Sequence, residues 1–315
     1  MRAESVRHDE FVWGSLETLC DGFGFTEGPL WHPSGTLLFQ DLRAAETLAW
    51  SRGTGVVRAR VGTGGANGQT FDQDGHVVFC EGSSTVHGGQ RRVGRVERDA
   101  TVSTLADRWE GRRLNAPNDI VSTRDGSLYF TNPKHIIPDE ELDIPYSAVY
   151  RIEPDGTTAE AGAVMPLPNG LAFSPDESIL YVADTRPDPR ILAYDVDERG
   201  DLGNERLLVG LPVAPEGPNL GPMLPDGIKI DVAGRLYVSA PGGVWVVDAS
   251  GIVLTILRTP EWVTNLAFGG DDGTTLFMTC RDRVSSVRTT TPGVQPHGAS
   301  SATPLWPFPD DGEAA

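Results

Sequence analysis

A short phrase recurs six times along this chain of 315 residues. Each copy begins with an acidic or amide residue, continues as a strand, turns at glycine or acidic residues, and ends in a second strand. The copies are EGPLWHPSGTLLFQD from Glu27, NGQTFDQDGHVVFCE from Asn67, NDIVSTRDGSLYFTN from Asn118, NGLAFSPDESILYVAD from Asn169, DGIKIDVAGRLYVSA from Asp226 and NLAFGGDDGTTLFMT from Asn265. Their spacing of roughly 40 to 57 residues is typical of a propeller or another repeat array.

Each repeat unit holds about four strand signals separated by turns rich in Gly, Asp and Pro. In the third unit the signals are NDIVST, SLYFTN, AVYRIE and TTAEAGAV. Five copies have a glycine eight positions after the leading residue, and the fourth has Glu177 there. No long segment shows helical periodicity. Six units of four strands therefore predict an all-β fold, a six-bladed β-propeller with four-stranded blades.

The chain ends predict how the ring closes. Only one strand signal, RVSSVRT, follows the sixth inner hairpin, and an unpaired signal, GSLETLC, precedes Glu27. We expect the N-terminal strand to complete the last blade. Residues 1–294 are then one propeller domain. Residues 295–315, rich in Pro, Ala and Ser, are expected to form a loosely ordered tail with Trp306 and Phe308 as candidate docking residues.

Composition narrows the class of partner. A formal net charge of −18 argues against nucleic acid or an anionic membrane as partner, and suits a small uncharged substrate or a bound cation. No segment is apolar and long enough to span a bilayer, and the N-terminus lacks the apolar core of a secretory signal. Three cysteines without a CxxC pair favour free thiols packed in strands and a cytoplasmic location. Monomer and homodimer both remain open.

The six leading residues are the candidate site. The first strand of each propeller blade lines the central channel, so equivalent positions converge on one ring. Two carboxylates and four amides in such a ring would be costly to bury without a partner, and a divalent cation would satisfy them. The alternative is that Asn and Asp begin strands because they cap turns. That alternative is retained for Asn67 and Asn265, whereas six copies in register, one of them a Glu, favour the metal.

Hairpin geometry predicts a second set of residues near the channel mouth. The second strand of each hairpin returns to the face of the leading residue. Its end residues are Asp41, Glu81, Asn132, Asp184 and Ala240, followed in the third unit by Lys134 and His135. Arg113 and Asn115 precede Asn118 on the same side. The predicted substrate contacts are Asn118, Arg113, Asn115, Glu81, Asn132 and His135. His135 as an acid or base competes with the simpler reading of a surface loop residue, and His32 is expected to be structural.

Several motifs together resemble the regucalcin/gluconolactonase family, the senescence-marker-protein-like six-bladed propellers. These motifs are FTEGPLWHPSGTLLFQDL, RRLNAPNDIVSTRDGSLYFTNP, PNGLAFSPDESILYVADT, PDGIKIDVAGRLYVSAPGGVWVVD and TNLAFGGDDGTTLFMT. The resemblance implies a divalent ion held by a Glu, an Asn and an Asp, which match Glu27, Asn169 and Asp226. Asn118 matches a further ligand or substrate contact. It also implies an enzyme that opens sugar lactones.

The expected reaction is metal-dependent lactone hydrolysis. The cation, Ca²⁺ first and Mg²⁺, Mn²⁺ or Zn²⁺ as alternatives, would polarise the carbonyl. Asp226 is the candidate general base and Glu27 a pure ligand. Two long segments, 133–147 and 211–224, are expected to select the substrate.

Three other functions stay open at this point: organophosphate hydrolysis, another metal-assisted reaction on a specialised metabolite, and a non-catalytic calcium-binding or binding-platform propeller.

Overall fold

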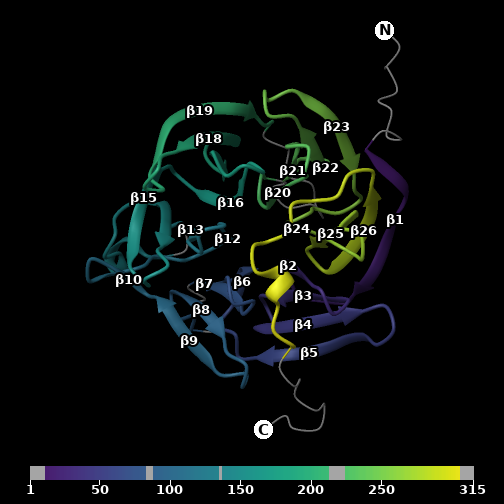
Figure 1. The fold of residues 1–315 in the computed structure, drawn as a ribbon, viewed down its shortest axis with the longest axis horizontal. Helices are drawn as coiled ribbons and strands as arrows, with labels where there is room; N and C mark the ends of the chain where they lie inside the picture. Colours follow the sequence, from purple (N-terminus) through teal and green to yellow (C-terminus); the bar gives the residue numbers. More distant parts are fainter. Residues whose placement is uncertain (1–10, 83–87, 135–136, 213–223, 306–315) are drawn as a thin grey trace.

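The computed structural model describes residues 11–82, 88–134, 137–212 and 224–305, which form six four-stranded antiparallel sheets around one axis (Figure 1). Within each blade the strands follow one another outward from the axis. The first three blades are β2 (Thr26–His32), β3 (Thr36–Asp41), β4 (Glu46–Ser51) and β5 (Gly55–Val61); β6 (Ala66–Phe71), β7 (Val77–Glu81), β8 (Arg92–Val96) and β9 (Val102–Ala106); and β12 (Ile120–Ser122), β13 (Leu128–Asn132), β14 (Ala148–Ile152) and β15 (Thr158–Val164).

The next two blades repeat this order, and the last one takes its outer strand from the N-terminus. They are β16 (Pro168–Phe173), β17 (Ile179–Asp184), β18 (Arg190–Val196) and β19 (Leu202–Gly210); β20 (Ile228–Ile230), β21 (Leu236–Ala240), β22 (Gly243–Val247) and β23 (Val253–Arg258); and β24 (Asn265–Gly269), β25 (Thr275–Cys280), β26 (Arg283–Thr289) and β1 (Val12–Asp21). The predicted six-bladed, four-stranded propeller is confirmed.

Ring closure is also as predicted. Strand β1 pairs antiparallel with β26, from Val12 opposite Thr289 to Asp21 opposite Arg283. The chain ends of the ring thus share one sheet, and β2 of the first blade contacts β24 of the last. Because the pairing covers the outer edge of β26, the last blade has four strands like the others.

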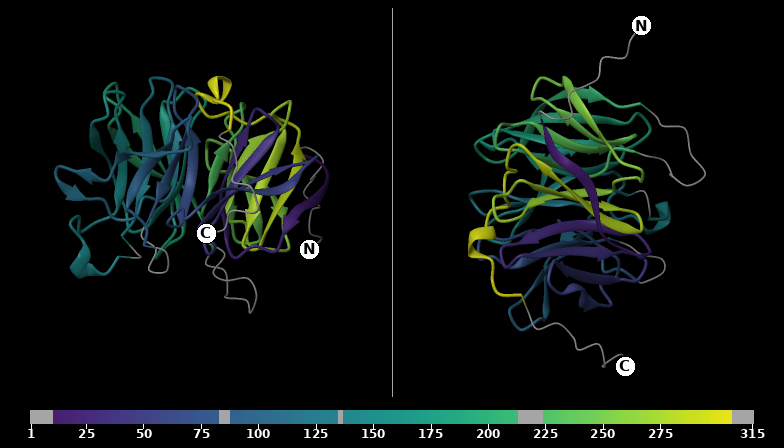
Figure 2. Two further views of the ribbon diagram at one scale, coloured as in Figure 1. Left: turned by 90° about the horizontal axis from the view of Figure 1, so that it is seen from below. Right: turned by 90° about the vertical axis from the view of Figure 1, so that its right-hand side faces the viewer.

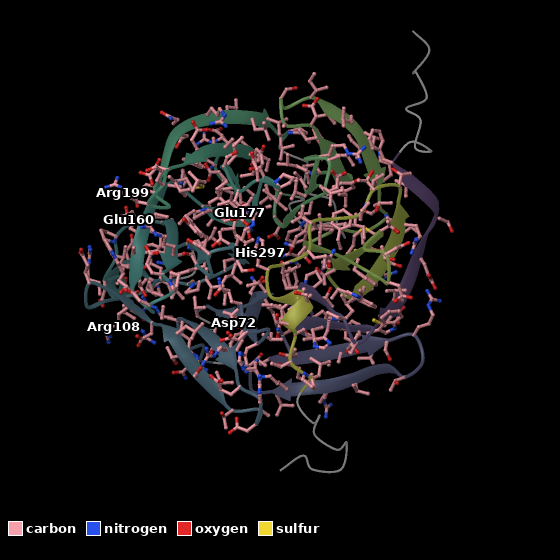
Figure 3. All side chains as sticks on the ribbon, in the orientation of Figure 1. Asp72, Arg108, Glu160, Glu177, Arg199 and His297 are labelled. Carbon is pink, nitrogen blue, oxygen red and sulfur yellow. The ribbon has the colours of Figure 1, made fainter. Side chains whose placement is uncertain are left out.

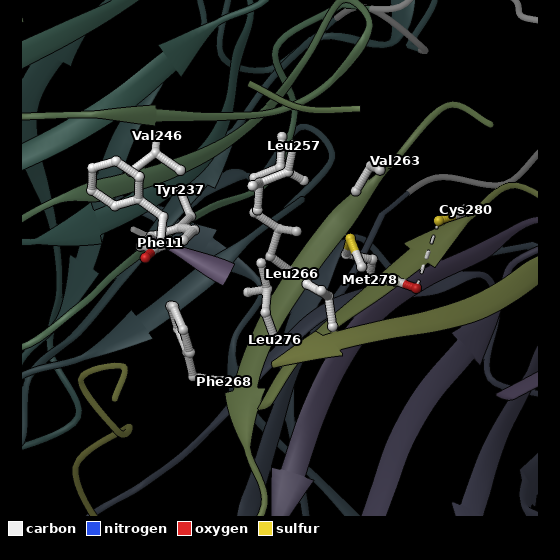
Figure 4. Close-up of a cluster of buried hydrophobic side chains, with 12 residues drawn as sticks. Phe11, Tyr237, Val246, Leu257, Val263, Leu266, Phe268, Leu276, Met278 and Cys280 are labelled. Atoms are coloured by element: carbon white, nitrogen blue, oxygen red, sulfur yellow. Dashed lines mark hydrogen bonds between the residues drawn. The ribbon is translucent and has the colours of Figure 1, made fainter. Parts of the chain in front are cut away.

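The hydrophobic core is divided among the interfaces between blades. Six clusters of buried side chains are present in the described part of the chain, and each joins two neighbouring blades. The cluster between the fifth and sixth blades includes Tyr237, Phe268 and Leu276, and Phe11 enters it just before β1 (Figure 4). Blades pack on both faces, which explains why β13, β14 and β21 are buried along their whole length.

The C-terminal segment crosses one face of the propeller. Within the predicted tail, residues 295–305 are described, and they are tied down where a loose arrangement was expected. The backbone N–H of Thr303 donates to the carbonyl of Gly75 at 3.0 Å, and the carbonyl of Thr303 lies 2.9 Å from His32 Nε2. This contact supports a structural role for His32. Trp306 and Phe308 lie outside the described residues.

The turn that departs from the glycine pattern is one anchor of this segment. Glu177 adopts φ +63°, in the left-handed region where the equivalent turn residues are glycines. Its carboxylate lies 2.5 Å from His297 Nε2 and accepts the backbone N–H of Arg124 (Figure 3). The Glu177 side chain binds the C-terminal segment through His297. These contacts offset the energetic cost of the left-handed backbone conformation at a residue other than glycine.

Three smaller elements of the described chain lie outside the six blades. A two-stranded hairpin, β10 (Arg108–Trp109) and β11 (Arg112–Arg113), and two 3₁₀ helices, η2 (Asp139–Glu141) and η3 (Ala299–Ser301), were not predicted. The 3₁₀ helices lie on opposite faces of the disc (Figure 2). No described helix has the length and apolar character needed to cross a membrane. Cys20, Cys80 and Cys280 are free thiols in strands, as predicted, and the cytoplasmic location stays a prediction.

Candidate functional site

The innermost strands bring five of the six leading residues to one cavity. Glu27, Asn67 and Asn169 lie at the beginning of β2, β6 and β16, and Asn118 and Asp226 stand two residues before β12 and β20. All five line a cavity of about 390 Å³ at one end of the axis. The other lining residues are Phe25, Leu167, Pro168, Thr185, Arg186, Leu224 and Trp262. The predicted convergence is therefore present for every leading residue except Asn265.

Close contacts between neighbouring blades hold the leading residues together. The N–H of Gly170 donates to the carbonyl of Asp226 at 3.1 Å, and the N–H of Gly68 donates to the carbonyl of Asn118 at 2.8 Å. A Cβ added to Gly170 would lie 2.2 Å from the Asp226 carbonyl oxygen, and one added to Gly28 would lie 2.0 Å from that of Asn67. The glycine after a leading residue is thus required for one blade to touch the leading residue of the next.

The two acidic side chains of the cavity are buried and destabilise each other's charge. Glu27 is 3% and Asp226 8% exposed. Burial, opposed by the N–H of Gly28 and reinforced by the nearby charge of Asp119, raises the pKa of Glu27 to about 7. Burial, followed by the charges of Glu27 and Asp119, raises the pKa of Asp226 well above its ordinary value. Two buried carboxylates of this kind are stabilised as anions by a bound cation.

The amides of the cavity supply further oxygen donors. The Oδ1 atom of Asn67 is buried and has no hydrogen-bond partner among the described residues. This orphaned oxygen contradicts the turn-capping interpretation of Asn67 and is what a ligand-facing group would show. Carboxylate and amide oxygens suit Ca²⁺, Mg²⁺ or Mn²⁺. Within the described residues no group of three or more His, Cys, Asp or Glu side chains forms a metal cluster, because this set contains only two carboxylates.

Asn265 belongs to a layer beneath the cavity. Its Oδ1 accepts the N–H of Leu266 at 2.8 Å, which agrees with the capping interpretation. Its Nδ2 lies 3.4 Å from Asp119 Oδ2, and Lys229 Nζ lies 3.4 Å from its Oδ1. The ring of six predicted from the repeat is therefore a ring of five above a polar layer of Asn265, Asp119 and Lys229.

Most of the predicted substrate contacts lie away from the cavity lining, with Asn118 the exception. Glu81 is ion-paired with Arg92 at 2.8 Å. Asn115 is fully buried and donates from Nδ2 to the Tyr146 carbonyl at 2.8 Å. The N–H of Arg113 donates to Asp143, and Asn132 is fully buried with neither side-chain atom hydrogen-bonded to a described residue.

The remaining strand ends are structural or undescribed. Asp41 accepts the N–H groups of Gly24 and Phe25, and Asp184 binds Arg190. Ala240 is buried. His135 and residues 213–223 of the predicted specificity segment lie outside the described residues.

The sequence did not predict most of the cavity walls or the layer below the cavity; Leu224, at the end of the predicted segment 211–224, is the exception among the lining residues. Phe25 and Trp262 stand two and three residues before Glu27 and Asn265, and their rings contact edge to face at 5.8 Å between centroids. Thr185 and Arg186 directly follow β17. The signal available for Asp119 was its place in the third copy, where the other hairpins mostly have glycine.

The comparisons with known proteins cover nearly the whole chain. The model of the SMP-30/gluconolactonase/LRE-like region matches residues 25–281. A gluconolactonase of Zymomonas mobilis is 32% identical over 88% of this chain and 82% of its own length. The chain belongs to the SMP-30/gluconolactonase/LRE-like family. A relative named pentonolactonase from Haloferax volcanii is 29% identical over 80% of each chain.

A solved structure shares the architecture. The gluconolactonase of Xanthomonas campestris superposes with a TM-score of 0.77 at 30% identity, covering 89% of this chain and 91% of that one. The family resemblance inferred from the repeat motifs is thus confirmed.

Proposed function

We propose that this protein is a metal-dependent hydrolase that opens sugar lactones, in which Glu27, Asn118, Asn169 and Asp226 hold one divalent cation. The observation that carries the proposal is the pair of buried carboxylates, Glu27 and Asp226, among amide oxygens at the end of the channel. Family membership and the names of the relatives, gluconolactonase and pentonolactonase, supply the substrate class.

Each ligand has its own support from the fold. Glu27 Oε2 accepts the N–H of Gly28 at 2.9 Å, which fixes the carboxylate at the beginning of β2. The Asn169 amide interacts with Asp226 and favours its charged form. Asn118 is held by its backbone, since its N–H donates to the Thr131 carbonyl at 2.9 Å. Ca²⁺ is the first expectation, and Mg²⁺, Mn²⁺ or Zn²⁺ would accept the same oxygens.

Lactone hydrolysis breaks the bond between the carbonyl carbon and the ring oxygen. A cation, when bound, supplies Lewis-acid polarisation of the carbonyl. Asp226 takes a proton from the water that attacks the carbonyl carbon, and the same proton passes to the ring oxygen as it leaves as a hydroxyl group. Glu27 stays charged throughout as a ligand. The product is the open hydroxy acid, so atoms and charge balance without a further reactant.

The cavity walls suit a compact ring. Phe25, Trp262 and Leu224 provide apolar surface on which the carbon face of a lactone can lie, while Asn67 Oδ1 can accept from a hydroxyl group. Arg186 is exposed among the lining residues. Residues 133–147 and 211–224 remain the proposed determinants of which lactone is accepted.

The test compares Asp226→Asn with Asp195→Asn, which changes an exposed carboxylate on β18. The proposal expects the Asp226 variant to lose at least about a hundredfold in kcat on a panel of sugar lactones while its fold is retained. The surface variant keeps its activity. Acid release is followed with a pH indicator, before and after chelation, and bound metal is measured by elemental analysis. Full activity of Asp226→Asn with cation bound would refute the mechanism.

A further inference from the structure

Only two lysines occur in the whole chain, Lys134 and Lys229, and one of them stands beneath the candidate metal site. Lys229 lies in β20, three residues after Asp226, and its Nζ donates to the Ile228 carbonyl at 3.0 Å. Its side chain lines a second cavity on the axis, which the innermost strands of all six blades also line. The positively charged ammonium group of Lys229 therefore lies inside the channel, between this second cavity and the carboxylates of the candidate metal site.

Asp119 lies between the Lys229 ammonium group and the candidate metal site. Its carboxylate is 2% exposed, its Oδ1 accepts the N–H of Ile120 at 2.9 Å, and its Oδ2 lies 4.0 Å from Lys229 Nζ. Asn265 bridges the two, since it lies 3.4 Å from each. Both charges reach the proposed ligands, because Asp119 raises and Lys229 lowers the pKa of Glu27 and of Asp226.

The sum of the charges of the buried side chains indicates the function of the polar layer of Asp119, Lys229 and Asn265. With both carboxylates ionised, as cation binding requires, Glu27 and Asp226 contribute two negative charges, Asp119 adds a third, and Lys229 cancels one, which leaves two among the buried groups. We infer that the Asp119–Lys229 pair sets the charge of the buried site to match a divalent cation, and so selects divalent over trivalent ions. Lys229 and Asp119 are positioning residues in this scheme, since their hydrogen bonds run to Asn265 and the backbone rather than into the cavity.

The inference rests on the proposed metal site and is tested by ion binding alone. Lys229→Met removes the internal positive charge at nearly constant shape. We expect it to raise the affinity ratio of La³⁺ to Ca²⁺ by roughly tenfold or more, because the extra charge of a trivalent ion then meets one more uncompensated negative charge. Asp119→Asn should move the ratio the other way, and the double variant should return towards the wild-type ratio.

Lys134→Met is the matched control. It removes the other lysine, which lies on the long segment after β13, 4.0 Å from the exposed Asp139, and it should leave the ratio unchanged. Binding of both ions is measured by titration calorimetry at one fixed pH, with circular dichroism for the fold and Lys229→Gln as a second variant.

The outcomes separate this inference from the proposed function. Equal weakening of both ions by Lys229→Met and Lys229→Gln would show a merely structural role and overturn the inference, while the metal site would stand. Absence of any cation binding to the wild-type protein would overturn both. Both outcomes are read from ion binding alone and do not depend on measuring lactone hydrolysis.

Discussion

Glu27 combines deep burial with a carboxyl group, and its protonation therefore couples to folding. Its pKa is raised from 4.5 to about 7, chiefly by burial. Between these two values the folded, metal-free protein holds a proton that the unfolded chain has already lost. Stability from this group is therefore full below pH 4.5 and is lost as the pH rises towards 7. The raised pKa of Asp226 acts in the same direction.

We accordingly expect the chelated protein to melt at lower temperature as the pH rises through that window. Glu27→Gln should flatten the dependence, because the amide has no proton to lose. Saturating Ca²⁺ should reverse it, since ligand binding to the folded state stabilises most when both carboxylates are ionised. Melting curves at several pH values check this. Parallel slopes for wild type and Glu27→Gln would contradict the assignment.

At the scale of single residues, the sequence predicted which side chains supply oxygen ligands better than it predicted what those side chains contact. Repetition in register identified Glu27 and Asp226, because a propeller turns equal positions in a sequence into neighbours in space. It did not predict that Asn265, for which the capping interpretation was retained, also contacts Asp119 and Lys229. Contacts of that kind depend on how deep each side chain sits along the axis, and a repeat pattern specifies only the blade and the strand position.

At the scale of elements, the glycine after the leading residue governs how blades meet. Gly170 carries no side chain because the carbonyl of Asp226 occupies that space. Gly170→Ala should therefore push the beginning of β20 outward and lower the free energy of unfolding by about 1–3 kcal/mol. It should also weaken cation binding, since Asp226 moves with the strand.

Gly203→Ala is the comparison within the same blade. Gly203 lies in the outermost strand β19, and a Cβ there meets no atom within 4 Å. Its substitution should change stability by less than about 1 kcal/mol and leave cation affinity unaltered. Urea unfolding and calorimetric titration of the two variants check the prediction, and equal losses in both would show that the interblade contact is unimportant.

The strands were predictable because characteristic turn residues separate them in the sequence. Glycines with positive φ, such as Gly126 and Gly234, occupy the hairpin turns. The four strand signals of the third unit fall on β12 to β15. The hairpin β10–β11 was missed, since two-residue strands leave no alternation to detect. The first strands β12 and β20 are shorter than their partners, although the N–H groups of Asn118 and Asp226 just before them still donate to carbonyls of β13 and β21.

For the molecule as a whole, stability depends on closing the ring. A chain that begins at Gly22 lacks β1 and leaves the edge of β26 unpaired, and it also loses Phe11 from the cluster between the last two blades. We expect it to melt about 10 °C or more below the wild type and to aggregate through the exposed edge. A chain that begins at Phe11 keeps β1 and should melt near the wild type. Scanning calorimetry of both compares them directly, and equal melting of the two shortened chains would reject closure by β1.

The C-terminal segment crosses the face opposite the candidate metal site, and this position affects how small molecules reach the channel. Residues 294–297 border the axis there, alongside side chains from every blade, and hydrogen bonds from Thr303 and Val294 fasten the segment to its surroundings. In the proposed reaction, the lactone therefore enters and the hydroxy acid leaves through the cavity lined by Asn118 and Asp226. We accordingly expect the hydroxy acid to inhibit turnover in competition with the lactone.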